Sequence, residues 1–316
     1  MKVTRIHTVS FVALVLMVLM AASGAMGAQS RSFVSVTGSD AANCQRATPC
    51  RTFSAAIRQT SDAGEVIALD SGGYGTTGVN RSMSLIAAPG VHAGITTAYG
   101  TGVAVTGSAT DRVVLRGLDI VTSGNATAID VLAPVSVSIE HCVLQQAGDP
   151  VYSIGVQAYS VGARISVSDS VLRGYFNALY TSVFGLPRGQ ITLNRVQFSD
   201  NVNSIFLIGD VDATIRDLLL HGGNGINIST NALVPPSATV SIERTTIANG
   251  WYGLTVEVVN GSAEVVLSET TIVNNVNAGY MITPGSPPSA KIFSRGNNTV
   301  YGNGPNVGTL IFLPGS

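Results

Sequence analysis

Residues 240–247 read VSIERTTI, and residues 265–272 read VVLSETTI. In both stretches the first and third residues are apolar, the fifth is charged, and the sixth and eighth are small or apolar. The alternation predicts a half-buried strand, and its break at the fifth position predicts a bend followed by a second short strand. Further copies of the pattern are VVLRGLDI (113–120), VSIEHCVL (137–144), ISVSDSVL (165–172), ITLNRVQF (191–198), ATIRDLLL (213–220) and, more loosely, IFSRGNNTV (292–300).

The copies begin 22 to 28 residues apart. A polar turn follows each copy, and a third strand comes next, often led by glycine as in GINI (225–228) and GLTV (253–256). A repeat of about 25 residues with three short strands is typical of one coil of a parallel β-helix, and not of a leucine-rich or helical repeat. The sequence therefore predicts an all-β, single-domain, right-handed parallel β-helix, with regular coils over residues 65–316.

Residues 29–64 are predicted to cap the N-terminal end of this solenoid. The stretch TFSAAIRQT (52–60) places Phe53, Ala56 and Ile57 on one face of a short amphipathic helix, which would cover the open hydrophobic end. The stretch NCQRATPC (43–50) predicts a small disulfide loop between Cys44 and Cys50. Cys142 occupies the sixth position of its repeat, so we expect a buried structural thiol rather than a nucleophile.

Residues 1–28 have the order of a cleaved signal peptide. Lys2 and Arg5 precede an apolar run over 11–22, and small residues follow, with cleavage expected after Ala25, Gly27 or Ala28. The run of about 12 residues is shorter than the roughly 20 that a membrane span needs, although an uncleaved anchor is the alternative. We expect a secreted, periplasmic or cell-surface protein with no membrane span after cleavage.

Charged residues make up 11% of the chain and the formal net charge is −1. A nucleic-acid-binding protein needs clustered lysines and arginines, and the arginines here are dispersed, so nucleic acid is not an expected partner.

The stretch PCRTFSAAIRQTSDAGEVIALDSGGYG (49–75), followed by the repeats, resembles the pectate-lyase-like superfamily of right-handed β-helix proteins. The resemblance covers nearly all of the chain after the signal segment. It implies the fold and makes polysaccharide a possible partner, but enzymes, adhesins and structural proteins share this fold. Among the enzymes it implies either carboxylates gathered around calcium with an arginine base, or closely spaced aspartates with Gly-His-Gly and Arg-x-Lys motifs. This sequence has no Asp-Asp pair and neither of those motifs.

The fifth repeat position alternates in charge from one coil to the next over its last five full copies. One interpretation is a surface ladder of ion pairs that fixes the register of the coils. The other is a catalytic groove in which Arg195 or Arg244 is the base. We favour the ladder, because every carboxylate has an arginine neighbour. The alternating residues are Asp169, Arg195, Asp217, Arg244 and Glu269.

The third strands place Tyr180 and Phe206 outward on adjacent coils, and Trp251 and Tyr252 lie at a preceding turn. Such aromatic rings are a common platform for sugars, although loops of the chain or a partner protein can equally cover an apolar stripe. Asp210 and Asp212 form the closest acidic pair and are the one candidate calcium site; no other cofactor is expected.

These observations favour a non-catalytic exported β-helix scaffold, either an envelope or surface protein or a glycan binder. The alternative is a divergent polysaccharide lyase or glycoside hydrolase that acts on a uronic-acid-containing polymer. The oligomeric state is not predicted.

Overall fold

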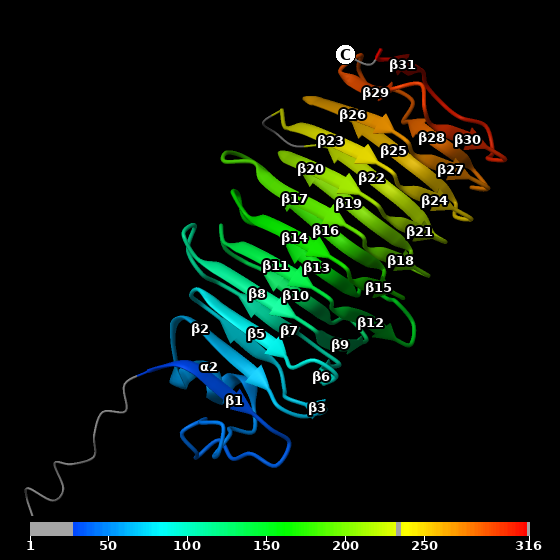
Figure 1. Ribbon diagram of the computed structural model, residues 1–316. Coiled ribbons are helices and arrows are strands. Elements are labelled where there is room, and N and C mark those ends of the chain that lie inside the picture. Colours follow the sequence, from blue (N-terminus) through cyan, green and yellow to red (C-terminus); the bar gives the residue numbers. More distant parts are fainter. Residues whose placement is uncertain (1–27, 232–234, 315–316) are drawn as a thin grey trace, which may run out of the picture.

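The computed structural model describes residues 28–231 and 235–314, and it shows a parallel β-solenoid (Figure 1). Three parallel sheets run along its axis, and a regular coil contributes one strand to each of them in turn. The predicted all-β parallel solenoid is confirmed. The predicted signal segment lies outside the described residues, apart from Ala28.

Sheet 1 contains the strands that begin each repeat. In sheet order these are β1 (Gln29–Val34), β2 (Thr60–Ala68), β5 (Met83–Ala87), β8 (Arg112–Arg116), β11 (Ser136–Glu140), β14 (Arg164–Ser168), β17 (Gly189–Asn194), β20 (Val211–Arg216), β23 (Ser237–Glu243), β26 (Ser262–Ser268), β29 (Ala290–Ser294) and β31 (Leu310–Phe312).

Sheet 2 follows the first bend of each coil. Its strands are β3 (Gly72–Gly73), β6 (Ala93–Thr97), β9 (Leu118–Ser123), β12 (Val143–Ala147), β15 (Val171–Arg173), β18 (Gln197–Ser199), β21 (Leu219–His221), β24 (Thr246–Ala248), β27 (Thr271–Val273) and β30 (Thr299–Tyr301).

Sheet 3 completes each coil. Its strands are β4 (Thr77–Val79), β7 (Thr101–Val105), β10 (Thr127–Val131), β13 (Ile154–Ala158), β16 (Asn177–Val183), β19 (Asn203–Gly209), β22 (Asn224–Thr230), β25 (Tyr252–Val258) and β28 (Ala278–Ile282).

Equivalent repeat positions pair directly across neighbouring coils. Val240 pairs with Val265 and Ile242 with Leu267, and all four side chains are buried in the interior. The residue between them, Ser241, faces outward. A row of aliphatic side chains therefore lines the inside of each sheet, and no coil can bury its apolar face without its neighbours.

The bend between sheet 1 and sheet 2 is a single residue in the left-handed backbone conformation, which explains why the alternation breaks at the fifth position. The residue there has a positive φ, between 47° and 70°, in all seven full copies of the repeat. These bend residues are Gly117, His141, Asp169, Arg195, Asp217, Arg244 and Glu269.

Buried asparagine amides stabilise the second bend, between sheets 2 and 3. Asn201 Oδ1 accepts a hydrogen bond from the Tyr175 amide at 2.9 Å, and its Nδ2 donates to the Leu172 carbonyl at 3.1 Å. Asn275 binds the Gly250 amide and the Ile247 carbonyl in the same way. These bonds satisfy main-chain groups that the turn removes from the ladders.

The N-terminal segment contains helix α2 (Phe53–Gln59), which Thr52 caps by accepting a hydrogen bond from the Ala55 amide. Phe53, Ala56 and Ile57 are buried, and the helix packs against β1, β2 and β4. Its role as the cover of the hydrophobic interior stays a prediction, as do the domain boundaries. Among the described residues, no helix is both long enough and apolar enough to span a bilayer.

The Cys44–Cys50 disulfide is present, as predicted. Cys142 is 1% exposed and is the free cysteine of the described chain.

Replacing Glu269 by glycine should raise the midpoint of thermal unfolding. The residue adopts a φ of 48°, and within the described chain its exposed side chain has no hydrogen-bond or ion-pair partner. Glycine therefore relieves about 1–2 kcal/mol of backbone strain without removing a side-chain interaction, and this gain exceeds its entropy cost of about 0.5–1 kcal/mol. The control is Ser241→Gly, at an exposed position inside β23, which should lower the midpoint. A lower midpoint for Glu269→Gly contradicts the assignment of strain to this bend.

Candidate functional site

The charged bend residues form two ion pairs on the edge between sheets 1 and 2. Arg195 donates from Nε and Nη2 to the two carboxylate oxygens of Asp169, at 2.6 and 2.8 Å. Arg244 binds Asp217 in the same bidentate way, at 2.8 and 3.2 Å, and also contacts Glu243. The side chain of Glu269 has no hydrogen-bond or ion-pair partner in the described chain.

These pairs hold their members in the charged state. The hydrogen bond from Arg195 lowers the pKa of Asp169, and the hydrogen bond from Arg244 lowers the pKa of Asp217. In return, the paired carboxylates raise the pKa values of Arg195 and Arg244. An arginine acts as a base only after losing its proton, so this arrangement opposes that role.

The acidic side chains of Asp210 and Asp212 have different binding partners. Asp210 accepts hydrogen bonds from the Gly185 and Ser237 amides, whereas Asp212 forms an ion pair with Arg188 at 2.9 Å. Within residues 28–231 and 235–314, no group of three or more His, Cys, Asp or Glu side chains is arranged to hold a metal ion. A calcium ion needs several oxygen ligands, and these two carboxylates are already engaged.

The outer face of sheet 3 carries a row of aromatic rings. Tyr180 and Phe206 pair on adjacent strands, with ring centroids 5.8 Å apart in an edge-to-face arrangement. Tyr159, in the loop after β13, adds a third ring 5.9 Å from Tyr180. Tyr159 is 47% exposed, and Tyr180 and Phe206 are half-buried, so solvent reaches this row. The predicted adjacency of Tyr180 and Phe206 is confirmed; their ligand-binding role stays a prediction.

A second row on the same face consists of asparagine side chains at the beginning of consecutive sheet 3 strands. Asn203 Nδ2 donates to Asn177 Oδ1 at 2.9 Å, and Asn224 Nδ2 donates to Asn203 Oδ1 at 2.8 Å. The buried Oδ1 of Asn224 has no hydrogen-bond partner among the residues that the structure describes. This amide row was not among the predicted site residues; its signal in the sequence is an asparagine three residues before Tyr180, Phe206 and Asn227 in successive repeats.

Asp130 lies at the N-terminal end of the aromatic row, in the register position that Gln157 and Tyr180 occupy on the next two strands. Burial raises the pKa of its carboxyl group, against the hydrogen bond that Gln157 donates at 3.3 Å. Burial also raises the pKa of Tyr159, and the nearby Tyr180 and Asp130 raise it further. These polar groups fit a surface that exchanges hydrogen bonds with a hydroxylated ligand.

Trp251 and Tyr252 lie two coils beyond Phe206. Tyr252 begins β25 and pairs with Asn224, and Trp251 at the bend is 52% exposed. Among the described residues, neither makes a ring contact with Phe206. They extend the amide row rather than the aromatic row.

The three parallel sheets define this chain as a parallel β-helix. Two solved structures share this fold. The pectate lyase Pel9A has a TM-score of 0.59 and 15% sequence identity, and the match covers 88% of this chain and 78% of that one. The polygalacturonase from Erwinia carotovora ssp. carotovora has a TM-score of 0.56 and 9% identity, and the match covers 90% of this chain and 94% of that one. No protein-family model and no curated protein sequence matches the chain. At these identities the likeness shows the fold alone.

Cys142 should resist alkylation in the folded protein. Burial raises the pKa of its thiol to about 12, so the thiolate is scarce and shielded at pH 8. Mass spectrometry after iodoacetamide treatment should show no adduct in native buffer and one adduct in urea without reductant. An adduct in native buffer contradicts the structural role of this cysteine.

Proposed function

We propose that this chain is an exported scaffold that binds a polysaccharide on the outer face of sheet 3 and does not cleave it. The observation that carries the proposal is the aromatic row Tyr159–Tyr180–Phe206 beside the amide row Asn177–Asn203–Asn224. Sugar rings pack their apolar faces on aromatic side chains, while amides exchange hydrogen bonds with the sugar hydroxyls.

The flat, periodic face suits an extended chain rather than a compact ligand. Each coil repeats the same positions about 4.8 Å further along the axis, so successive sugars meet equivalent side chains. The two solved structures with this fold are named as a pectate lyase and a polygalacturonase, whose names denote polysaccharide-acting enzymes, and this supports a glycan as the ligand class.

The absence of cleavage is proposed because four of the five charged bend residues pair with one another, and only Glu269 is without an ion pair in the described chain. Glycoside hydrolysis uses two carboxyl groups with different protonation states across the scissile bond. Here Asp169 and Asp217 are each held by an arginine, and Asp210 and Asp212 are bound by main-chain amides and Arg188. We propose that the ion-paired bend residues fix the register of the coils.

A second candidate function is cleavage of a uronic-acid polymer by a divergent lyase or hydrolase. The half-buried carboxyl of Asp130 favours it, because a raised pKa suits a proton donor and the aromatic row lies beside it. Turnover of polygalacturonate or alginate by the purified protein, lost on Asp130→Asn or on Asp169→Ala and Asp217→Ala, would establish this function instead.

Export completes the proposal. The N-terminus of the protein recovered outside the cytoplasm should begin after residue 25, 27 or 28, as read by N-terminal sequencing. Recovery of the intact N-terminus in the membrane fraction would instead identify an anchor.

Tyr180→Ala and Phe206→Ala should each weaken glycan binding about fivefold, because loss of one ring contact costs about 1 kcal/mol. A glycan array would first identify the ligand, and titration calorimetry would then measure the affinities. Thr255→Ala, at the same register position two strands beyond Phe206, is the matched control and should bind as the unmodified protein does. Unchanged binding by both aromatic variants rejects sheet 3 as the site.

A further inference from the structure

The outer face of sheet 1 carries a groove along the solenoid axis, on a different side of the coil from the aromatic row. Three hollows of about 250, 320 and 290 Å³ follow one another along it. The first two share Arg112 and Val114, and the last two share Thr192. Together they extend from β2 and β5 to β20 and the bend residue Arg244, and we name them the axial groove.

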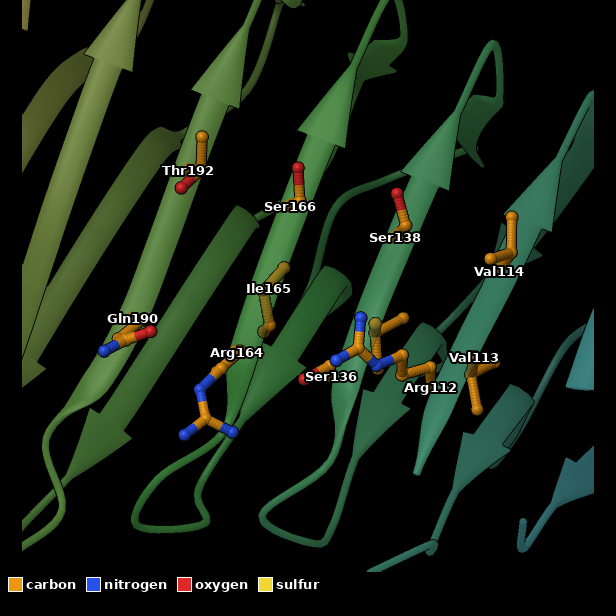
Figure 2. A pocket seen from close by; sticks show the side chains of 11 residues that line it. Arg112, Val113, Val114, Ser136, Ser138, Arg164, Ile165, Ser166, Gln190 and Thr192 are labelled. Carbon is orange, nitrogen blue, oxygen red and sulfur yellow. The ribbon is translucent and has the colours of Figure 1, made fainter. Parts of the chain in front are cut away.

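The groove follows the middle outward row of the sheet 1 strands, and the longer side chains of Arg112, Arg164 and Gln190 flank it. Figure 2 shows this middle row beside the flanking row of Arg112, Ser136, Arg164 and Gln190. Most of the middle residues carry a hydroxyl group, so the floor of the groove can both donate and accept hydrogen bonds. The floor residues are Ser84, Val114, Ser138, Ser166, Thr192 and Thr214.

Two arginines in the central hollow have no side-chain hydrogen-bond or ion-pair partner in the part of the chain that the structure describes. The guanidinium groups of Arg112 and Arg164 are exposed, and neither makes a hydrogen bond or ion pair within the described chain (Figure 2). Among the outward-facing side chains of β8, β11, β14 and β17, the acidic one is Glu140, and Arg116 forms an ion pair with it at 2.7 Å. The carboxylate of Asp111, next to Arg112, is held by Ser82 and Ser108.

Further along sheet 1 the cations are matched by carboxylates. Arg188 pairs with Asp212, Arg216 with Glu243, and Lys291 with Glu264. The groove arginines that form no ion pair within the described chain therefore lie between β8 and β14, where Arg112 and Arg164 stand two coils apart. Two steps of a parallel ladder separate them by about 10 Å along the axis.

We propose that the axial groove binds an acidic polysaccharide lengthwise, with Arg112 and Arg164 each holding an anionic group on alternate sugars. A 1,4-linked pyranose chain advances by about one ladder step per sugar, so every second sugar faces an arginine. Each guanidinium offers a fork of N–H donors that fits a carboxylate or a sulfate ester. The floor hydroxyls between the arginines exchange hydrogen bonds with the sugar hydroxyls.

The groove fits a polysaccharide better than a nucleic acid. No aromatic side chain lines any of the three hollows, whereas single-stranded nucleic acids bind through bases stacked on aromatic rings. Two free cations also provide too little charge for a polymer with one phosphate at every nucleotide.

The experiment compares two polymers with the same backbone and different charge. Oligomers of polygalacturonate carry the carboxylates, and fully methyl-esterified oligomers of the same length do not. The unmodified protein should bind the charged oligomer at least tenfold more tightly at low ionic strength, and the preference should shrink as salt is added. Dextran sulfate in a parallel titration tests the sulfate ester as the source of the anionic group.

The Arg112→Ala/Arg164→Ala variant should lose this preference while keeping its circular dichroism spectrum and unfolding midpoint, because neither guanidinium has an internal partner. The lysine pair Arg112→Lys/Arg164→Lys should keep part of the preference, since the charge remains and the fork is lost. Arg173→Ala removes an exposed arginine from sheet 2, where it binds Gln145, and should leave the preference unchanged.

The outcomes separate this site from the one on sheet 3. Loss of acidic-oligomer binding in the Tyr180→Ala/Phe206→Ala variant, with the double arginine variant unaffected, overturns the groove as the site. Equal affinity for the charged and esterified oligomers, failure to bind either polygalacturonate or dextran sulfate, or tighter binding of single-stranded DNA also overturns it. Selective loss in the double arginine variant supports the groove even if sheet 3 binds no glycan.

Discussion

The whole structure depends on the in-register parallel ladder that joins each strand to the equivalent strand of the next coil. Because the register stays constant from coil to coil over long stretches, a residue type at one repeat position becomes a row along the axis. The inward rows are aliphatic and build a continuous core that no single coil could form. Every surface feature is a row of the same kind: the bend residues, the amides, the aromatic rings and the floor of the axial groove.

At the one-residue bend, the repeating ladder requires a left-handed backbone conformation that most side chains disfavour. Left-handed backbone favours glycine, asparagine and aspartate, yet Arg195, Arg244 and Glu269 adopt it. Two of these residues form bidentate ion pairs with an aspartate on the preceding coil, and such pairs are strongest when both partners are held in place. The bend therefore brings the charged groups of neighbouring coils together.

The sequence was sufficient to predict the elements that repeat with a hydrophobic signal. The parallel coils, the Cys44–Cys50 disulfide, the buried Cys142 and the adjacency of Tyr180 and Phe206 follow from periodicity and spacing. The break at the fifth position was visible, but its left-handed conformation was not. The glycine at position 117, in the same column as the charged residues, was the available signal.

The outer rows were harder to predict, because their meaning depends on which side chains are left without partners. Asn177, Asn203 and Asn224 lie in turn-like sequence, where asparagine is common for local reasons, so their ladder emerges only when the coils are stacked. Arg112 and Arg164 look like any dispersed arginines in the sequence. They become distinct only because Arg116, Arg195 and Arg244 have carboxylates to bind and these two do not.

Whether charged side chains are paired with one another bears on whether they suit ligand binding or catalysis. Catalysis by carboxyl groups needs members of a pair whose environments drive their pKa values apart, whereas Asp169 and Asp217 are both shifted in the same direction by an arginine. Arg112 and Arg164 have no ion-pair partner among the described residues, line the axial groove, and lie two coils apart along the axis. Weak contacts spaced along such an axis add together when one chain occupies them all, because each further contact is intramolecular. A solenoid can therefore hold a long polymer firmly with sites that are individually weak, and lengthening the bound chain from two sugars to six should tighten binding far more than any single side-chain contact does.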